Sequence, residues 1–176
     1  VAPGDPVEAE LATRAIIDRA GPCYMRLGKT GEKTLHEGKV HFQLGKAITL
    51  RGGHDLTLIA TGGMLHNTVK VADLLSRDGI QARVLSMHTI KPLDTSEVLA
   101  AAKETAAIVT IEEHSVIGGL GSAVAEVLAE ICDVKVAFKR LGLPSMFVSE
   151  VGSQAYLLDV FSLSVDGILN SIRPLL

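Results

Sequence analysis

The residues with the clearest chemical potential lie in the stretch Glu112–Glu130, "EEHSVIGGLGSAVAEVLAE", where acidic residues and a histidine precede a glycine-rich turn. Gly119 and Gly121 lead into an apolar helical pattern, and backbone N–H groups at a helix N-terminus can bind phosphate. A dinucleotide-binding fingerprint also needs a third small residue and a later acidic residue. Val124 occupies the third position and Asp133 comes too early. We therefore favour a packing role, with the turn allowing close approach of the helix to the sheet or to another subunit.

Glu113 and His114 could form an acid/base pair, because histidine titrates near neutrality and a carboxylate can fix its tautomer. The alternative is that they cap the turn or contact a second subunit. Ser115 is adjacent to His114 and poorly placed for activation, and no G-x-S-x-G nucleophile motif is present. We favour the alternative and assign no catalytic residue.

Two further residues qualify as binding candidates. His88, in "SMHTIKPLD", follows a predicted strand, where a hydrogen-bonded structural role is more common than a catalytic one. Arg26 leaves the apolar stretch "CYMRLG", and its planar guanidinium suits a phosphate or a carboxylate. A salt bridge to a neighbouring domain explains Arg26 equally well.

Composition limits the classes of partner. The 176 residues carry a net charge of −3 and 3% aromatic residues, which argues against nucleic acid binding. We find no continuous apolar run of about 18 residues and expect no membrane span. The six histidines lack metal-ligand spacing, so no metal site is expected. Cys23 and Cys132 are expected to be buried free thiols.

The N-terminal part reads as the end of a preceding domain. Asp5-Pro6-Val7-Glu8 predicts a helix start, and the helix should run to about Ala20. A short buried strand is predicted in "CYMRLG". We assign residues 1–28 to the end of one domain, 29–45 to a linker and 46–176 to a second domain. The abrupt start at Val1 is typical of a piece of a longer protein.

After the linker the pattern alternates between strands and helices. Near-continuous β-branched and leucine runs predict strands that are covered on both faces, as in a parallel sheet. The fold class is therefore α/β, a three-layer αβα arrangement with a mostly parallel, doubly wound sheet, whose strand ends meet at one ligand-binding edge. Strands are predicted at 47–53, 56–62, 81–87, 106–113 and 134–142, and helices at 63–77, 95–103 and after the glycine turn. Asp94 and Glu97 predict an N-terminal capping box for the helix at 95–103.

Six stretches, in order, resemble the C-terminal half of transketolases, and of the split type in particular, in which the two halves are separate polypeptides. They are "APGDPVEAELATRAI", "GPCYMRLGK", "LTLIATGGM", "VLSMHTIKPLD", "IVTIEEHSVIGGLGSAVAE" and "RLGLPSMFVSEVGS". The same superfamily contains 1-deoxyxylulose-5-phosphate synthase and the beta chains of 2-oxo acid dehydrogenases. These relatives commonly have arginine where this chain has His88, so His88 favours a transketolase.

The resemblance implies a cytoplasmic, homodimeric enzyme of pentose phosphate metabolism that moves a two-carbon ketol unit between sugar phosphates. Its thiamine diphosphate and Mg²⁺ belong to domains that would lie in a partner N-terminal half, so none is expected to bind this segment alone. Arg26 matches an arginine that contacts the sugar phosphate of the substrate. The segment itself would assemble the dimer and border the active site, at His88, Glu113, His114, Gly119 and Gly121. A stand-alone nucleotide-binding or regulatory module is the alternative of another class.

Overall fold

The fold is built on a five-stranded sheet, seen in a computed structural model that describes residues 1–29, 31–130 and 135–176. The strand order is β1-β3-β2-β4-β5, and β1 pairs antiparallel to β3 while the other pairs are parallel. This confirms the predicted α/β class. The strands are β1 (Ile48–Arg51), β2 (Leu56–Ala60), β3 (Ala82–Ser86), β4 (Ala107–Ser115) and β5 (Ala137–Leu143).

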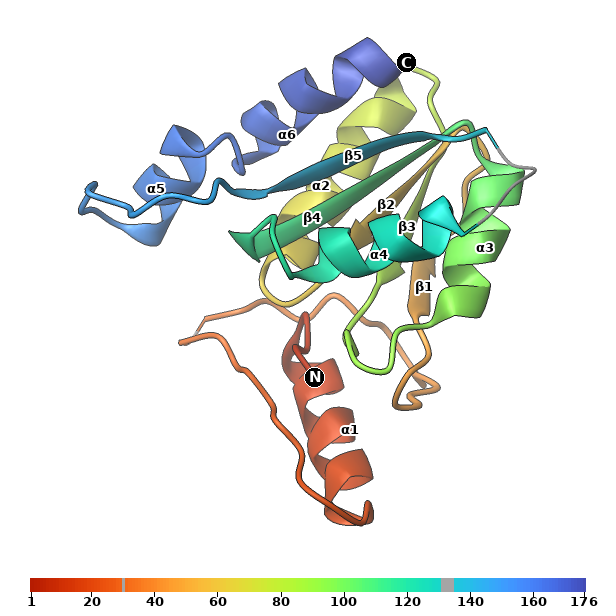
Figure 1. The fold of residues 1–176 in the computed structure, drawn as a ribbon, viewed down its shortest axis with the longest axis vertical. Helices are drawn as coiled ribbons and strands as arrows, with labels where there is room; N and C mark the ends of the chain where they lie inside the picture. The colour runs from red at the N-terminus through yellow and green to blue at the C-terminus, as the bar shows by residue number, and fades with distance from the viewer. Residues whose placement is uncertain (30, 131–134) are drawn as a thin grey trace.

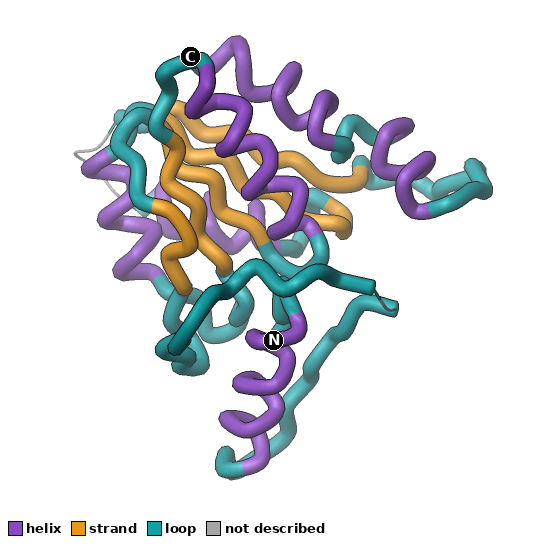
Figure 2. The backbone as a smooth tube through the Cα atoms, turned by 180° about the vertical axis from the view of Figure 1, so that it is seen from behind, coloured by secondary structure: helices purple, strands orange, loops and turns teal. Residues whose placement is uncertain are grey.

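Helices cover both faces of the sheet (Figures 1 and 2). Every residue of the central strand β2 is buried, and successive side chains point to opposite faces. Leu58 joins the core under two helices, whereas Ile59 joins the separate core under the other two. The first face carries α2 (Met64–Arg77) and α6 (Val165–Ile172), and the second carries α3 (Thr95–Glu104) and α4 (Leu120–Ala129).

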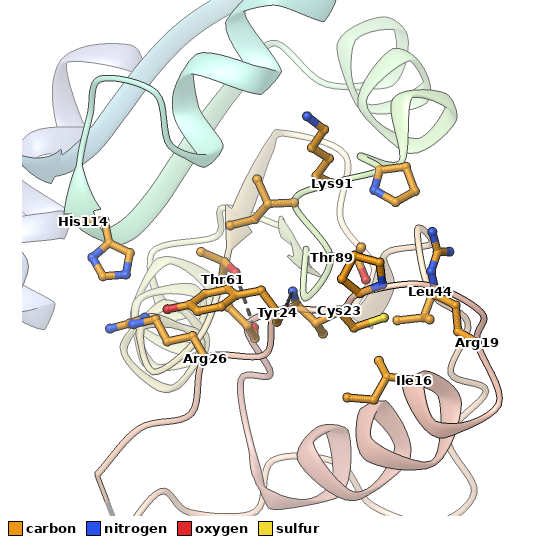
Figure 3. Close-up of a pocket in the computed structure, with 15 residues that line it drawn as sticks. Ile16, Arg19, Cys23, Tyr24, Arg26, Leu44, Thr61, Thr89, Lys91 and His114 are labelled. Carbon is orange, nitrogen blue, oxygen red and sulfur yellow. Dashed lines mark hydrogen bonds between the residues drawn. The ribbon is translucent and has the colours of Figure 1, made fainter.

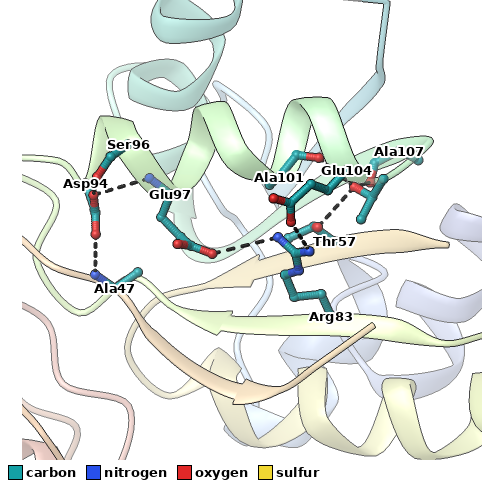
Figure 4. A network of polar contacts seen from close by, with 10 residues as sticks. Ala47, Thr57, Arg83, Asp94, Ser96, Glu97, Ala101, Glu104 and Ala107 are labelled. Atoms are coloured by element: carbon teal, nitrogen blue, oxygen red, sulfur yellow. Dashed lines mark hydrogen bonds and ion pairs between the residues drawn. The ribbon is translucent and has the colours of Figure 1, made fainter. Parts of the chain in front are cut away.

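The predicted cap of α3 is present and also fastens the edge strand. The Asp94 carboxylate accepts the Glu97 backbone N–H at 3.3 Å, as an N-cap does, and the Ala47 N–H at 3.0 Å (Figure 4). Arg83 on β3 forms ion pairs with Glu97 and Glu104 of the same helix. One helix is thus anchored at both ends to the strands beneath it.

Helix α1 (Pro6–Ile17) lies outside the three layers, beyond the carboxyl ends of the parallel strands (Figure 1). Asp5 caps it by accepting the Glu8 N–H at 2.8 Å, and the Glu8 carboxylate accepts the Gly4 N–H at 2.7 Å. The helix start is confirmed, although the helix ends three residues before the predicted Ala20. The helix is fixed at its first turn, close to the sheet.

The predicted buried strand at "CYMRLG" is wrong. Residues 22–28 are extended but form no strand, and Tyr24 and Leu27 are exposed. A strand needs a neighbour along its length. Among the described residues, the backbone of this segment is hydrogen-bonded only to Val1, which donates to the Tyr24 carbonyl and accepts from the Arg26 N–H. Cys23 is correspondingly exposed and not buried as predicted, while Cys132 lies outside the described residues.

Two helices and a 3₁₀ turn near the C-terminus were not predicted. They are α5 (Gln154–Val160), α6 and η1 (Arg173–Leu175). Their start signals are present in the sequence, since Ser153 caps α5 and Ser164 caps α6 through their side-chain oxygens. The two helices have only 7 and 8 residues, which is about two helical turns each, and so short a segment repeats the helical period too few times to be recognised.

The stretch 154–175 is long and apolar enough to cross a membrane by length and composition, with a mean hydropathy of 1.3. It is not a continuous apolar run, because it contains Asp159, Asp166 and Arg173. The structure divides it into three helical pieces, with a break at Ser162, whose φ is 57°. Ile168 and Ile172 of α6 are buried in the core beside α2, as in a helix that packs on a sheet.

Close packing of α4 against the sheet gives a test of the fold. A Cβ at Gly121 would lie 2.8 Å from both Arg140 Cγ and Thr110 Oγ1. We expect Gly121→Val to lower the free energy of unfolding by about 1–3 kcal/mol, because overpacking displaces these neighbours. Urea unfolding measures the change. Gly52→Val is the matched control, since nothing lies within 4 Å of its Cβ. Equal stability of the two variants would contradict the packing.

Candidate functional site

A pocket of about 500 Å³ opens at the carboxyl edge of the sheet, between the N-terminal segment and the loops that follow the strands (Figure 3). Its walls combine apolar groups from α1 and from residues 22–24 with polar and cationic side chains. The latter are Arg19, Arg26, Thr61, Thr89, Lys91 and His114. Lys91 was missed as a site residue, although its place in the loop after a strand is a signal that could have found it.

Backbone hydrogen bonds fix the N-terminal segment across this edge. The Ala2 N–H donates to the His88 carbonyl at 2.7 Å, and the Ala2 carbonyl accepts the Gly62 N–H at 3.1 Å. Ala2 therefore bridges the loops that follow β3 and β2. Val1 continues the path, because its carbonyl accepts the Arg26 N–H at 2.9 Å. Arg26 is thereby held at the edge although no strand contains it.

Arg26 forms a salt bridge with Glu113, at the carboxyl end of β4. Its Nη2 atom lies 3.3 Å from Glu113 Oε2, and the two side chains are 31% and 24% exposed. The sequence analysis left a salt bridge to a neighbouring domain as one explanation of Arg26. A salt bridge does form, but Arg26 makes it with Glu113 of this same chain. A partly exposed pair contributes only about 0–1 kcal/mol to stability, so stability alone does not explain why a cation is placed here.

His114 lines the same pocket as Arg26. Burial lowers the pKa of His114 below its ordinary value, the charge of Arg26 lowers it further, and Glu113 raises it. The imidazole is therefore neutral near pH 7. No hydrogen bond joins Glu113 to His114 among the described contacts, because Glu113 accepts from Arg26 and from Gln154. The hypothetical acid/base pair is not formed.

The glycine turn already holds an anion of its own. The buried Glu112 carboxylate accepts the Leu120 N–H at 2.9 Å and the Gly121 N–H at 2.8 Å, at the start of α4. A Cβ at Gly119 would lie 1.9 Å from Glu112 Oε2. Burial raises the pKa of Glu112, while these N–H groups and Arg140 lower it. The geometry therefore favours packing over phosphate binding. The sequence contained a sign of this role that we missed, because Glu112 is an acidic residue at the end of an otherwise apolar, buried strand.

His88 is fully buried and lies apart from the pocket lining. Its ring stacks on Phe42 with 4.1 Å between centroids, and its Nδ1 lies 2.9 Å from Thr89 Oγ1. Burial lowers the pKa of His88, so the ring is neutral. The structure thus brings Arg26, Glu113 and His114 together, while His88 and the two glycines of the turn serve packing.

The family model described as "Transketolase, C-terminal domain" matches residues 45–168. The chain belongs to the transketolase family.

Two relatives and a solved structure extend the match of this transketolase-family chain. It is 41% identical to the 6-deoxy-6-sulfo-D-fructose transketolase subunit of Clostridium sp. (strain MSTE9), over 96% of this chain and 52% of the relative. It is 36% identical to the 1-deoxy-D-xylulose-5-phosphate synthase of Heliobacterium modesticaldum, over 99% of this chain and 27% of the relative. A split-gene transketolase, solved as an inactive β4 tetramer, superimposes with a TM-score of 0.88 at 34% identity, covering 98% of this chain and 55% of that one. The chain thus spans about half the length of the transketolase subunits that it matches.

Titration of His114 tests the electrostatics of the pocket. We expect its pKa below about 6.5, the ordinary value for histidine. Arg26→Gln should raise this pKa because a neighbouring positive charge is lost, whereas Glu113→Gln should lower it because a negative charge is lost. NMR titration of the His114 ring protons measures both shifts, with exposed His54 as the internal control. Shifts of the same sign in the two variants would contradict the geometry.

Proposed function

We propose that this chain is the C-terminal subunit of a transketolase-type enzyme that transfers a two-carbon ketol unit between sugar phosphates. The observation that carries the proposal is the placement of Arg26 at the open edge of the sheet, in a pocket shared with neutral His114. A guanidinium with free donors suits the anionic tail of a sugar. The relatives' names fit this class, since one contains a sulfo sugar and the other a sugar phosphate.

The proposed cofactor, thiamine diphosphate with Mg²⁺, would be held by the N-terminal half. The described residues contain no group of three or more His, Cys, Asp or Glu side chains that could hold a metal ion. The helix N-terminus that might accept a diphosphate is filled by Glu112. Because the Glu112 carboxylate occupies this N-terminus, it does not fit a diphosphate, and we propose that the N-terminal half holds the cofactor.

Two other candidate functions can be tested with the same enzyme, reconstituted from this chain and its N-terminal subunit. The first is the activity of a 1-deoxy-D-xylulose-5-phosphate synthase, and the 36% identity to such an enzyme is the observation that favours it. His88 favours the transketolase, as the resemblance implies. The nucleotide-binding module loses its main support, because Glu112 occupies the glycine turn that a nucleotide phosphate would need.

Arg26 gives the direct test of the substrate class. With the N-terminal subunit added, we expect Arg26→Ala to raise KM for phosphorylated sugars about 10- to 100-fold, since charge-assisted hydrogen bonds contribute roughly 1.5–3 kcal/mol. Unphosphorylated short aldehydes should be nearly unaffected. Arg14→Ala, which removes an exposed arginine of α1, is the matched control. Equal losses for both substrate classes would assign Arg26 to structure alone.

We also propose that the segment assembles the enzyme through an apolar arm, residues 144–160. The arm comprises an irregular stretch and α5, which has no buried residue. Phe147 is 101% exposed and Val151 is 94% exposed, and several more apolar side chains are exposed around them. Contiguous apolar surface of this kind is typical of protein interfaces. Its irregular stretch runs out past the end of β5, where a second copy can reach it (Figure 1).

Substitution in the arm tests its role in assembly. We expect Phe147→Asp to shift the molecular mass toward that of the single chain, because a buried carboxylate without a partner is costly at an interface. Sedimentation equilibrium measures the mass over a range of concentrations. Leu176→Asp, at an exposed apolar residue outside the arm, is the control. An unchanged mass for Phe147→Asp would refute the role of the arm.

A further inference from the structure

The two oxygens of the Glu113 carboxylate are divided between two partners from distant parts of the chain. Oε2 faces Arg26 Nη2 at 3.3 Å, and Oε1 accepts a hydrogen bond from Gln154 Nε2 at 2.6 Å. We propose that Glu113 is a positioning residue for Arg26, and that Gln154 holds Glu113 in turn. This inference rests on the proposed function of Arg26 as the contact for the anionic tail of the substrate.

Arg26 needs such support because its own segment provides little. Residues 22–28 are irregular, and within the described part of the chain the Arg26 backbone is bonded only through its N–H to Val1. A long side chain on such a segment would sample many rotamers and lose that freedom when it binds an anion. Glu113 stands on β4, the strand beside central β2, and so offers a rigid reference point.

The contact with Glu113 orients the Arg26 guanidinium and leaves most of its N–H donors free. Arginine has five N–H donors, and the contact with Glu113 is a single one through Nη2. Nη1 lies near the backbone that follows β2, where a Cβ added to Gly62 would be 3.4 Å away from it. The remaining donors have no protein partner among the described hydrogen bonds, and Arg26 is one of the residues that line the pocket. An incoming anion can therefore bind Arg26 while Glu113 keeps it in place.

Gln154 makes the orientation of Glu113 specific. It is the first residue of α5, and its amide draws one carboxylate oxygen away from Arg26 and leaves the other facing it. A second carboxylate–guanidinium bond would otherwise occupy two donors of the fork. The link also joins the apolar arm to the substrate contact, because α5 belongs to that arm. Ordering of the arm would then order Arg26.

NMR of the isolated full chain tests the positioning directly, without any substrate or partner subunit. The guanidinium signals of Arg26, assigned with Arg26→Lys, should show restricted rotation in the unaltered chain. Glu113→Ala should give averaged signals like those of exposed arginines, and Gln154→Leu should give an intermediate result. Glu10→Ala and Gln81→Leu, both at exposed positions, are the controls. An Arg26 that stays restricted in Glu113→Ala overturns the proposal.

Kinetics with the N-terminal subunit separates positioning from competition. We expect Glu113→Ala to raise KM for phosphorylated sugars about 3- to 10-fold, with little change in kcat or in KM for short aldehydes. When Arg26→Ala is already present, adding Glu113→Ala should have no further effect, because the residue that it positions is gone. A lower KM would show that Glu113 competes with the anion, and a loss for both substrate classes would show a structural role. Either result overturns the proposal. A silent Arg26→Ala would instead refute the proposed function, and the NMR result would still decide whether Glu113 positions Arg26.

Discussion

The backbone pairing of Val1 and Ala2 is the constraint on which the site depends. Ala2 bonds to the loops after β2 and β3, and Val1 bonds to the segment that carries Arg26. These bonds hold the first residues of the chain, while the Phe42–His88 stack and the Ala47–Asp94 hydrogen bond hold the end of the segment that follows α1. The Arg26 guanidinium lies near Glu113 and His114 because the backbone of Val1 and Ala2 fixes the position of residue 26 relative to the ends of the strands. Main-chain bonds therefore place the side chain proposed to bind substrate.

The topology decides where that edge is open. The chain leaves β2 into α2 on one face and leaves neighbouring β4 into α4 on the other face, so the two loops diverge. Such a divergence is where ligands bind in open α/β sheets. The turn before α4 is closed by the Glu112 carboxylate, which leaves the loop after β2 and the last residues of β4 to border the pocket. With the turn occupied by Glu112, the pocket that Arg26 and His114 line is the open part of this edge.

Local signals predicted most of the fold. The leucine and β-branched runs gave the central strands, and Asp5 and Asp94 marked two helix starts through their caps. Features that depend on distant partners could not be predicted in this way. Residues 22–28 look like a strand but lack neighbours along their length. Arg26 and Glu113 are 87 positions apart, so spacing could not pair them, whereas adjacent Glu113 and His114 suggested a pair that does not form.

Amide hydrogen exchange tests most directly whether residues 1 and 2 fix Arg26 at the edge. The N–H groups of Gly62 and Arg26 donate to the Ala2 and Val1 carbonyls, whereas the Leu27 N–H has no backbone partner among the described contacts. We predict that Gly62 and Arg26 exchange about 100-fold or more slowly than an unstructured chain, and that Leu27 exchanges near the unstructured rate. Exchange of all three amides at the unstructured rate would contradict the placement of Arg26.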